Sequence, residues 1–115
     1  MPEQKIQEPI AIGCFAIEEL QQLLEQSPDQ VIIIDVRSPE EFAEKHIPGA
    51  INIPLSELES RSGELSRQTT IITACGKGGG RSAQGAELLK QSGFINANYL
   101  CGGTFGWYEA LLKQI

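Results

Sequence analysis

Short runs of apolar or β-branched residues divide the chain at fairly regular intervals. Residues 31–34 are continuously apolar, as expected for a strand covered on both faces of a sheet. Residues 69–74 form a second run that is mostly β-branched, and three shorter runs have a similar character. The predicted strands are therefore residues 10–12, 31–34, 50–53, 69–74 and 97–100.

Between these runs, apolar residues recur at intervals of three and four, which is the period of a helix with one buried face. This spacing predicts helices near residues 17–24 and 82–90 and a broken helix over residues 55–65. A terminal helix is predicted after the Gly102-Gly103 turn, with Trp107, Leu111 and Leu112 on one apolar face. A further helix is predicted to begin at Ser38, because Pro39 suits the first helical position and Glu41 completes a capping box. It should end at about Lys45.

Strands that alternate with helices predict an α/β domain with a mostly parallel sheet and helices on both faces. A chain of 115 residues is long enough for one such domain and too short for two. We assign the domain to residues 10–115 and expect the polar residues 1–9 to form a flexible tail. Ligands of parallel sheets bind beyond the carboxyl ends of the strands, where Asp35, Cys75 and Cys101 fall.

The composition of the chain argues against nucleic acid and membranes as binding partners. The formal net charge of −6 disfavours nucleic-acid binding, which depends on neutralising phosphates. No apolar stretch approaches the length that spans a bilayer, and residues 1–9 lack the basic start and apolar core of a secretory leader. We therefore expect a cytoplasmic protein that binds neither nucleic acid nor membrane, and the sequence leaves its oligomeric state open.

Residues 75–82, Cys-Gly-Lys-Gly-Gly-Gly-Arg-Ser, join a predicted strand to a helix N-terminus. A thiol becomes a good nucleophile where N–H dipoles, a helix N-terminus or cations stabilise its thiolate. Glycines can adopt left-handed conformations that turn successive N–H groups toward an anion. We interpret Cys75 as a nucleophile within an anion cradle; the alternative is a buried apolar cysteine at a flexible turn. The cradle residues are Gly76, Lys77, Gly78, Gly79, Gly80, Arg81 and Ser82.

Three blocks of sequence resemble the rhodanese-like domain family, and the resemblance covers residues 12–112. The first block comprises residues 34–42 and 46–54, the second residues 75–82 and the third residues 100–107. The resemblance implies a three-layer α/β/α fold around a central, mostly parallel five-stranded sheet. It also implies a sulfurtransferase in which Cys75 takes a sulfane sulfur from an anionic donor such as thiosulfate. The sulfur would be held as a persulfide and passed to a thiol or to cyanide, without a metal or an organic cofactor.

One departure from the family pattern leaves other functions open. Arg81 stands six positions after Cys75, in a Cys-x5-Arg arrangement, whereas short family members usually place this arginine one position earlier. The longer spacing resembles cell-cycle phosphatases of the dual-specificity type and certain arsenate reductases. A phosphatase needs a general acid, and residues 76–80 contain no carboxylate, so we favour sulfur transfer with thiosulfate or a bulkier polysulfide donor. A regulatory module that binds an anion or a partner without turnover is the third alternative.

Four further residues are interpreted as structural. The resemblance implies that Asp35 ties neighbouring loops together by accepting backbone hydrogen bonds, although a strand-end carboxylate could also act as a base. We expect Arg37 to pair with Glu41 or another nearby carboxylate, and His46 to anchor the turn that follows it. Trp107 is expected in the core, with a place in the pocket wall as the alternative.

The three cysteines are expected to have different roles. Three widely spaced cysteines argue against a disulfide framework, and a single histidine without a Cys-x-x-Cys motif argues against a metal site. Cys101 is either an inert buried thiol or a resolving thiol, which would form a disulfide with Cys75 or accept its persulfide. The second role requires Cα atoms within about 7 Å of each other. No catalytic role is expected for Cys14.

Overall fold

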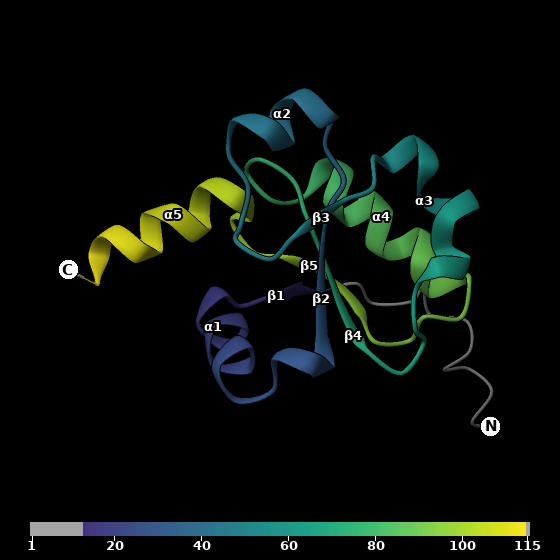
Figure 1. Ribbon diagram of the computed structural model, residues 1–115, viewed down its shortest axis with the longest axis horizontal. Helices are drawn as coiled ribbons and strands as arrows, with labels where there is room; N and C mark the ends of the chain where they lie inside the picture. The colour runs from purple at the N-terminus through teal and green to yellow at the C-terminus, as the bar shows by residue number, and fades with distance from the viewer. Residues whose placement is uncertain (1–12, 115) are drawn as a thin grey trace, which may run out of the picture.

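The computed structural model describes residues 13–114 and contains a five-stranded sheet in which all neighbouring strands are parallel (Figure 1). The strands lie in the order β1-β5-β4-β2-β3. Their bounds are Cys14–Phe15 for β1, Val31–Asp35 for β2, Ile51–Asn52 for β3, Thr70–Ala74 for β4 and Ala97–Leu100 for β5. The predicted α/β fold is thus confirmed. The predicted strand at 10–12 and tail at 1–9 lie outside the described residues.

The helices agree with the predicted pattern, and the one after the cysteine loop begins two residues earlier than predicted. Their bounds are Ile17–Gln26 for α1, Pro39–Glu44 for α2, Leu55–Arg61 for α3, Gly80–Gln91 for α4 and Gly103–Lys113 for α5. The predicted break in the third helix is a 3-10 turn at Ser62–Glu64. No helix within residues 13–114 is both long and apolar enough to cross a membrane.

Helices cover both faces of the sheet, with α1 and α5 on one side and α3 and α4 on the other (Figure 1). Two buried clusters result. Ile71 of β4 packs in one cluster with Leu58 and Leu89, and its neighbour Ile72 packs in the other with Leu20 and Trp107. Successive side chains of a strand point to opposite faces, so this continuously buried strand serves both cores.

Helix α2 begins with the capping box that the sequence predicts. The Ser38 hydroxyl accepts a hydrogen bond of 3.2 Å from the backbone N–H of Glu41, and the Glu41 carboxylate accepts one of 3.1 Å from the backbone N–H of Ser38. Two otherwise unpaired N–H groups of the first turn are satisfied in this way. Ser38 and Glu41 follow β2 closely in the chain, so this cap lies near the carboxyl end of that strand.

A buried ion pair joins the end of β2 to the end of α2. Asp35 and Arg37 are 1% and 3% exposed, and the Arg37 Nη2 atom lies 2.8 Å from the Asp35 carboxylate and 2.6 Å from the carbonyl oxygen of Lys45. The backbone N–H of Arg37 also donates to Asp35, at 3.0 Å. The hydrogen bond to Asp35 is the main reason why the pKa of Arg37 is raised. Each charge is therefore compensated only while the other is present.

Replacing Arg37 by methionine should lower the free energy of unfolding by about 3 kcal/mol, because it leaves the Asp35 carboxylate buried without its cation. The matched control is Arg61→Met, which removes an arginine whose ion pairs with Glu57 and Glu64 lie at the surface of the protein. That change should leave the free energy of unfolding almost unchanged, because exposed ion pairs contribute little. Urea denaturation followed by tryptophan fluorescence measures both values, and equal losses for the two variants would contradict the assignment.

Candidate active site

The carboxyl ends of three neighbouring strands bring the predicted site residues to one edge of the sheet. Asp35 at the end of β2 is in register with Ala74 at the end of β4, directly before Cys75. Thr73 of β4 is in register with Tyr99 of β5, two residues before Cys101. The predicted placement of the loop at this edge is therefore what the structure shows.

The loop that follows Cys75 depends on glycine at three successive positions. Gly78, Gly79 and Gly80 have φ angles of +89°, +71° and +48°, a region that other residues rarely adopt. Gly78 is also needed for space, since a Cβ atom there would lie 2.8 Å from the backbone nitrogen of Gly102. The loop is thus pressed against the turn that leads into α5.

The start of α5 holds the loop by its backbone. The N–H of Thr104 donates to the carbonyl oxygen of Cys75 at 2.8 Å, and the N–H of Phe105 donates to the carbonyl oxygen of Gly76 at 2.9 Å. Unpaired N–H groups of a helix N-terminus are therefore satisfied by the active loop itself. This arrangement fixes which way the peptide groups at 75 and 76 face.

The backbone N–H groups of residues 76–79 donate no hydrogen bond to the described part of the protein. Within residues 13–114, no backbone or side-chain acceptor receives a hydrogen bond from the N–H groups of residues 76–79. Two carbonyls of the loop are held by α5 while four N–H groups have no protein partner. Such a set of donors beside a helix N-terminus is suited to an anion.

Cys75 is 6% exposed, and its sulfur lies between two oxygen atoms. The Sγ atom is 3.1 Å from the carbonyl oxygen of Gly79 and 3.2 Å from the Oγ atom of Ser82. Ser82 is fully buried and donates its own proton to the Gly79 carbonyl at 2.8 Å. Since a hydroxyl can rotate, Ser82 can instead donate to the sulfur when the sulfur is negatively charged. Thr73 supports this region from β4 by donating to the carbonyl oxygen of Ser82 at 2.7 Å.

Arg81 does not lie free at the mouth of the loop. Its two terminal nitrogens donate to the two carboxylate oxygens of Glu41, at 2.9 and 3.1 Å. This hydrogen bonding is the largest cause of two shifts: it lowers the pKa of Glu41 to about 2 and raises the pKa of Arg81. The pair connects the loop to α2. From sequence, Glu41 is expected only to cap α2 and to pair with Arg37, so its contact with Arg81 is a finding of the structure.

Lys77 lies on the other side of the loop. It lines a surface hollow together with Gly102, Phe105, Gly106 and Glu109. The Phe105 ring packs against the loop at Gly76: a Cβ atom added to Gly76 would lie 3.2 Å from this ring. A cationic, an anionic and an aromatic side chain, those of Lys77, Glu109 and Phe105, therefore line this hollow at the start of α5.

The structure shows which groups contact the four residues that were interpreted as structural. Asp35 accepts the backbone N–H of Arg37, and Arg37 pairs with Asp35, which is the other carboxylate that the sequence analysis allowed, and not with Glu41. The Nδ1 atom of His46 lies 2.7 Å from the carbonyl oxygen of Phe42, so the ring is anchored to α2. Trp107 is buried in the core between α1 and α5.

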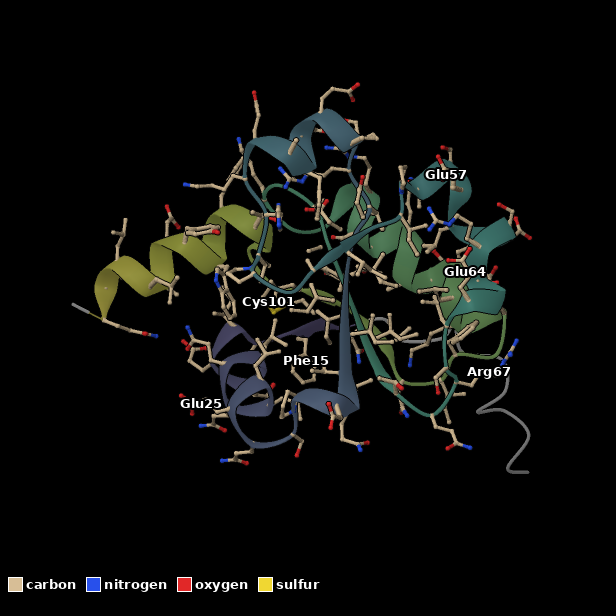
Figure 2. All side chains as sticks on the ribbon, viewed as in Figure 1. Phe15, Glu25, Glu57, Glu64, Arg67 and Cys101 are labelled. Atoms are coloured by element: carbon tan, nitrogen blue, oxygen red, sulfur yellow. A yellow bond between two sulfur atoms is a disulfide. The ribbon has the colours of Figure 1, made fainter. Side chains whose placement is uncertain are left out.

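The predicted roles of Cys101 need correction. The structure pairs Cys101 with Cys14 in a disulfide and leaves Cys75 as the free cysteine among the described residues. Cys101 is therefore neither an inert thiol nor available to resolve Cys75 in this state. A count of three widely spaced cysteines did not exclude a disulfide, because two of the three can pair and leave one free. In Figure 2, Cys101 lies in the middle of the molecule, between α5 and the β1 and α1 segment.

The edge strand β1 explains the pairing. Cys14 is in register with Tyr99 of β5, and the N–H of Cys101 donates to the carbonyl oxygen of Phe15 at 3.0 Å. The two Cα atoms are consequently 4.8 Å apart, within the ordinary range for a disulfide. The sequence analysis placed the first strand at residues 10–12, so this contact was missed. Within the sequence, the two apolar residues Cys14 and Phe15 are the local sign of the strand β1.

Comparisons with known proteins agree with this geometry. The profile of the rhodanese-like domain family matches residues 16–110, so the chain belongs to this family. A sulfurtransferase of Allochromatium vinosum is 32% identical over 90 residues, which cover 78% of this chain and 82% of that protein. A human single-domain sulfurtransferase has a TM-score of 0.72 and 29% identity, covering 86% of this chain and 97% of that one.

Not every relative has the length of a single domain. A putative sulfur carrier protein of Bacillus subtilis is 37% identical over 81 residues, which cover 70% of this chain but only 43% of that protein. The chain thus spans less than half the length of that relative. The similarity supports a protein of the sulfurtransferase kind and leaves its donor and acceptor to be inferred.

Gly103→Ala should detach the active loop from α5. A Cβ atom at this position, where φ is +64°, would lie 2.6 Å from both the Cys75 carbonyl oxygen and the Gly78 nitrogen. We expect a loss of about 2 kcal/mol in unfolding free energy and faster native-state alkylation of Cys75. The control is Gly49→Ala, with φ of +87° and open space around its Cβ position. Slow alkylation in both variants would show that Gly103 does not hold the loop.

Thiol titration checks the disulfide. With Cys14 and Cys101 paired and Cys75 free, the oxidised protein unfolded in denaturant should release one thiol per chain, and three after reduction. Because the bond closes a sequence separation of 87 residues, reduction should lower the unfolding free energy by about 2–4 kcal/mol. A Cys14→Ala variant should show the lower stability with and without reductant. Three thiols in the oxidised protein would contradict the pairing.

Proposed function

We propose that the protein is a sulfurtransferase that carries a sulfane sulfur on Cys75. The observation that carries this proposal is the loop backbone: two carbonyls are held by α5, and the N–H groups of residues 76–79 have no acceptor within the described residues. A terminal persulfide anion or the oxygens of thiosulfate would supply the missing acceptors. Membership of the rhodanese-like family supports the same reaction type.

The reaction begins with attack of the Cys75 thiolate on the outer sulfur of thiosulfate. The S–S bond of thiosulfate breaks, and sulfite leaves with the bonding electron pair, so no proton donor is needed for the leaving group. Cys75 is then a persulfide anion, toward which the loop N–H groups and the Ser82 hydroxyl can donate. Attack by cyanide on the terminal sulfur produces thiocyanate and restores the thiolate. A thiol acceptor would leave as a hydropersulfide.

Phosphatase chemistry is less well supported by the same site. It requires a general acid near the loop to protonate the leaving oxygen. The carboxylate that contacts the loop arginine is Glu41, whose pKa is lowered to about 2 by its hydrogen bonds from Arg81 and Ser38. A group that has already lost its proton at neutral pH cannot donate one. A thiosulfate or polysulfide donor therefore suits the loop better than a phosphate ester.

Intact mass spectrometry tests the proposal directly. After incubation with thiosulfate and removal of the excess, the protein, kept free of reductant, should be heavier by one sulfur atom, and cyanide should remove that mass while forming thiocyanate. Cys75→Ser should gain no sulfur because the hydroxyl is a far weaker nucleophile. The matched control is the double variant Cys14→Ala/Cys101→Ala, which removes both disulfide cysteines, keeps Cys75 and should gain the sulfur normally. Absence of the added mass with thiosulfate and polysulfide alike, or hydrolysis of an aryl phosphate instead, would refute the proposal.

A further inference from the structure

Glu41 joins two structures that would otherwise be independent. Its carboxylate receives the backbone N–H of Ser38 at 3.1 Å and so belongs to the cap of α2. The same carboxylate receives both terminal nitrogens of Arg81 from the active loop. In Figure 1, α2 lies beside the loop that leads into α4. Glu41 is thus fixed by its own helix in a position that faces the loop arginine.

This contact occupies the group that the sequence analysis assigned to the anionic donor. Arg81 carries five N–H donors, and Glu41 engages both terminal nitrogens in the paired geometry that guanidinium groups form with carboxylates. An anion that reaches Arg81 must displace Glu41 or bind beside its negative charge. Either route weakens binding of the anion relative to a site without Glu41.

We propose that Glu41 is a specificity-determining residue that competes with anionic donors for Arg81 and lowers the affinity of the site for small dianions such as thiosulfate. The choice of thiosulfate rests on the proposed function, whereas the competition itself applies to any small anion at the loop. Donors that depend less on Arg81 would be favoured in comparison. The pair is partly exposed, so an anion can reach it from solvent.

The ionisation of both partners supports this competition. The pKa of Glu41 is lowered to about 2, first by the hydrogen bond from Arg81 and then by the backbone hydrogen bond from Ser38. The carboxylate therefore stays charged at any pH at which the enzyme would be assayed, and a competing anion is what can release Arg81. The pKa of Arg81 is raised mainly by Glu41 and to a smaller extent by the charge of Cys75, so its guanidinium lies within electrostatic reach of the nucleophile.

Glu41→Gln tests the proposal with little change to α2, because glutamine also accepts the N–H of a capping serine. The KM for thiosulfate should fall about two- to fivefold while kcat changes little, since an exposed ion pair contributes only weakly. The matched control is Glu40→Gln, which removes the same charge from the neighbouring position of α2. Its KM should stay within error of the unmodified protein. An unchanged or higher KM in Glu41→Gln would overturn the proposal.

A second measurement is independent of turnover. Sulfate resembles thiosulfate in shape and charge but has no sulfane sulfur, and it should protect Cys75 from iodoacetamide. Half-protection should require about two- to fivefold less sulfate in Glu41→Gln than in Glu40→Gln. In an Arg81→Met background the difference between the two substitutions should disappear, because Glu41 acts through Arg81.

The two proposals can fail separately. Tighter sulfate protection in Glu41→Gln without any persulfide on Cys75 would support the role of Glu41 and refute sulfur transfer. Persulfide formation with equal sulfate protection in the two variants would support sulfur transfer and refute competition by Glu41. Weaker protection in Glu41→Gln would also refute it, because Glu41 would then help Arg81 to bind anions.

Discussion

The two hydrogen bonds from the start of α5 to the carbonyl oxygens of Cys75 and Gly76 are the contacts on which the rest of the site depends. In a trans peptide the N–H points away from the carbonyl, so holding these two carbonyls turns the N–H groups of Gly76 and Lys77 away from α5, and both have no acceptor within the described residues. The contact is close enough to require glycine at both surfaces, at Gly78 in the loop and at Gly103 in the helix. The loop is therefore formed jointly by two distant segments of the chain.

Several other features stabilise the same junction. The disulfide between Cys14 and Cys101 ties the edge strand to the residue just before the turn into α5. On the opposite side, the buried pair of Asp35 and Arg37 fixes the end of β2 to the end of α2, and α2 presents Glu41 to the loop. The nucleophile candidate is thus enclosed by elements that are cross-linked to one another by a covalent bond, a buried ion pair and a surface ion pair. In the proposed sulfur transfer, such enclosure would preorganise the site for charge that develops on sulfur.

Features that depend on residues close together in the sequence were predicted correctly, whereas features that depend on distant residues were missed. The capping box of α2 was predicted correctly because Ser38 and Glu41 are three residues apart and bond to each other. The central strands were predicted correctly because a run such as residues 31–34 is stable only when both faces are buried. In contrast, β1 contains two residues and owes its existence to pairing with β5, so its local pattern carried little information. The pairing of Cys14 with Cys101 was missed for the same reason.

The sequence by itself determined the order of strands and helices, the family, and a loop whose residue types suit an anion beside a thiol, since these depend on nearest neighbours and on side-chain chemistry. Only the tertiary structure decided what each charged or reactive group faces. Arg81 pairs with a carboxylate 40 residues away, and Cys101 pairs with a cysteine 87 residues away. Contacts across such separations are set by the register of the sheet and by the packing of helices on it, and local sequence does not encode them.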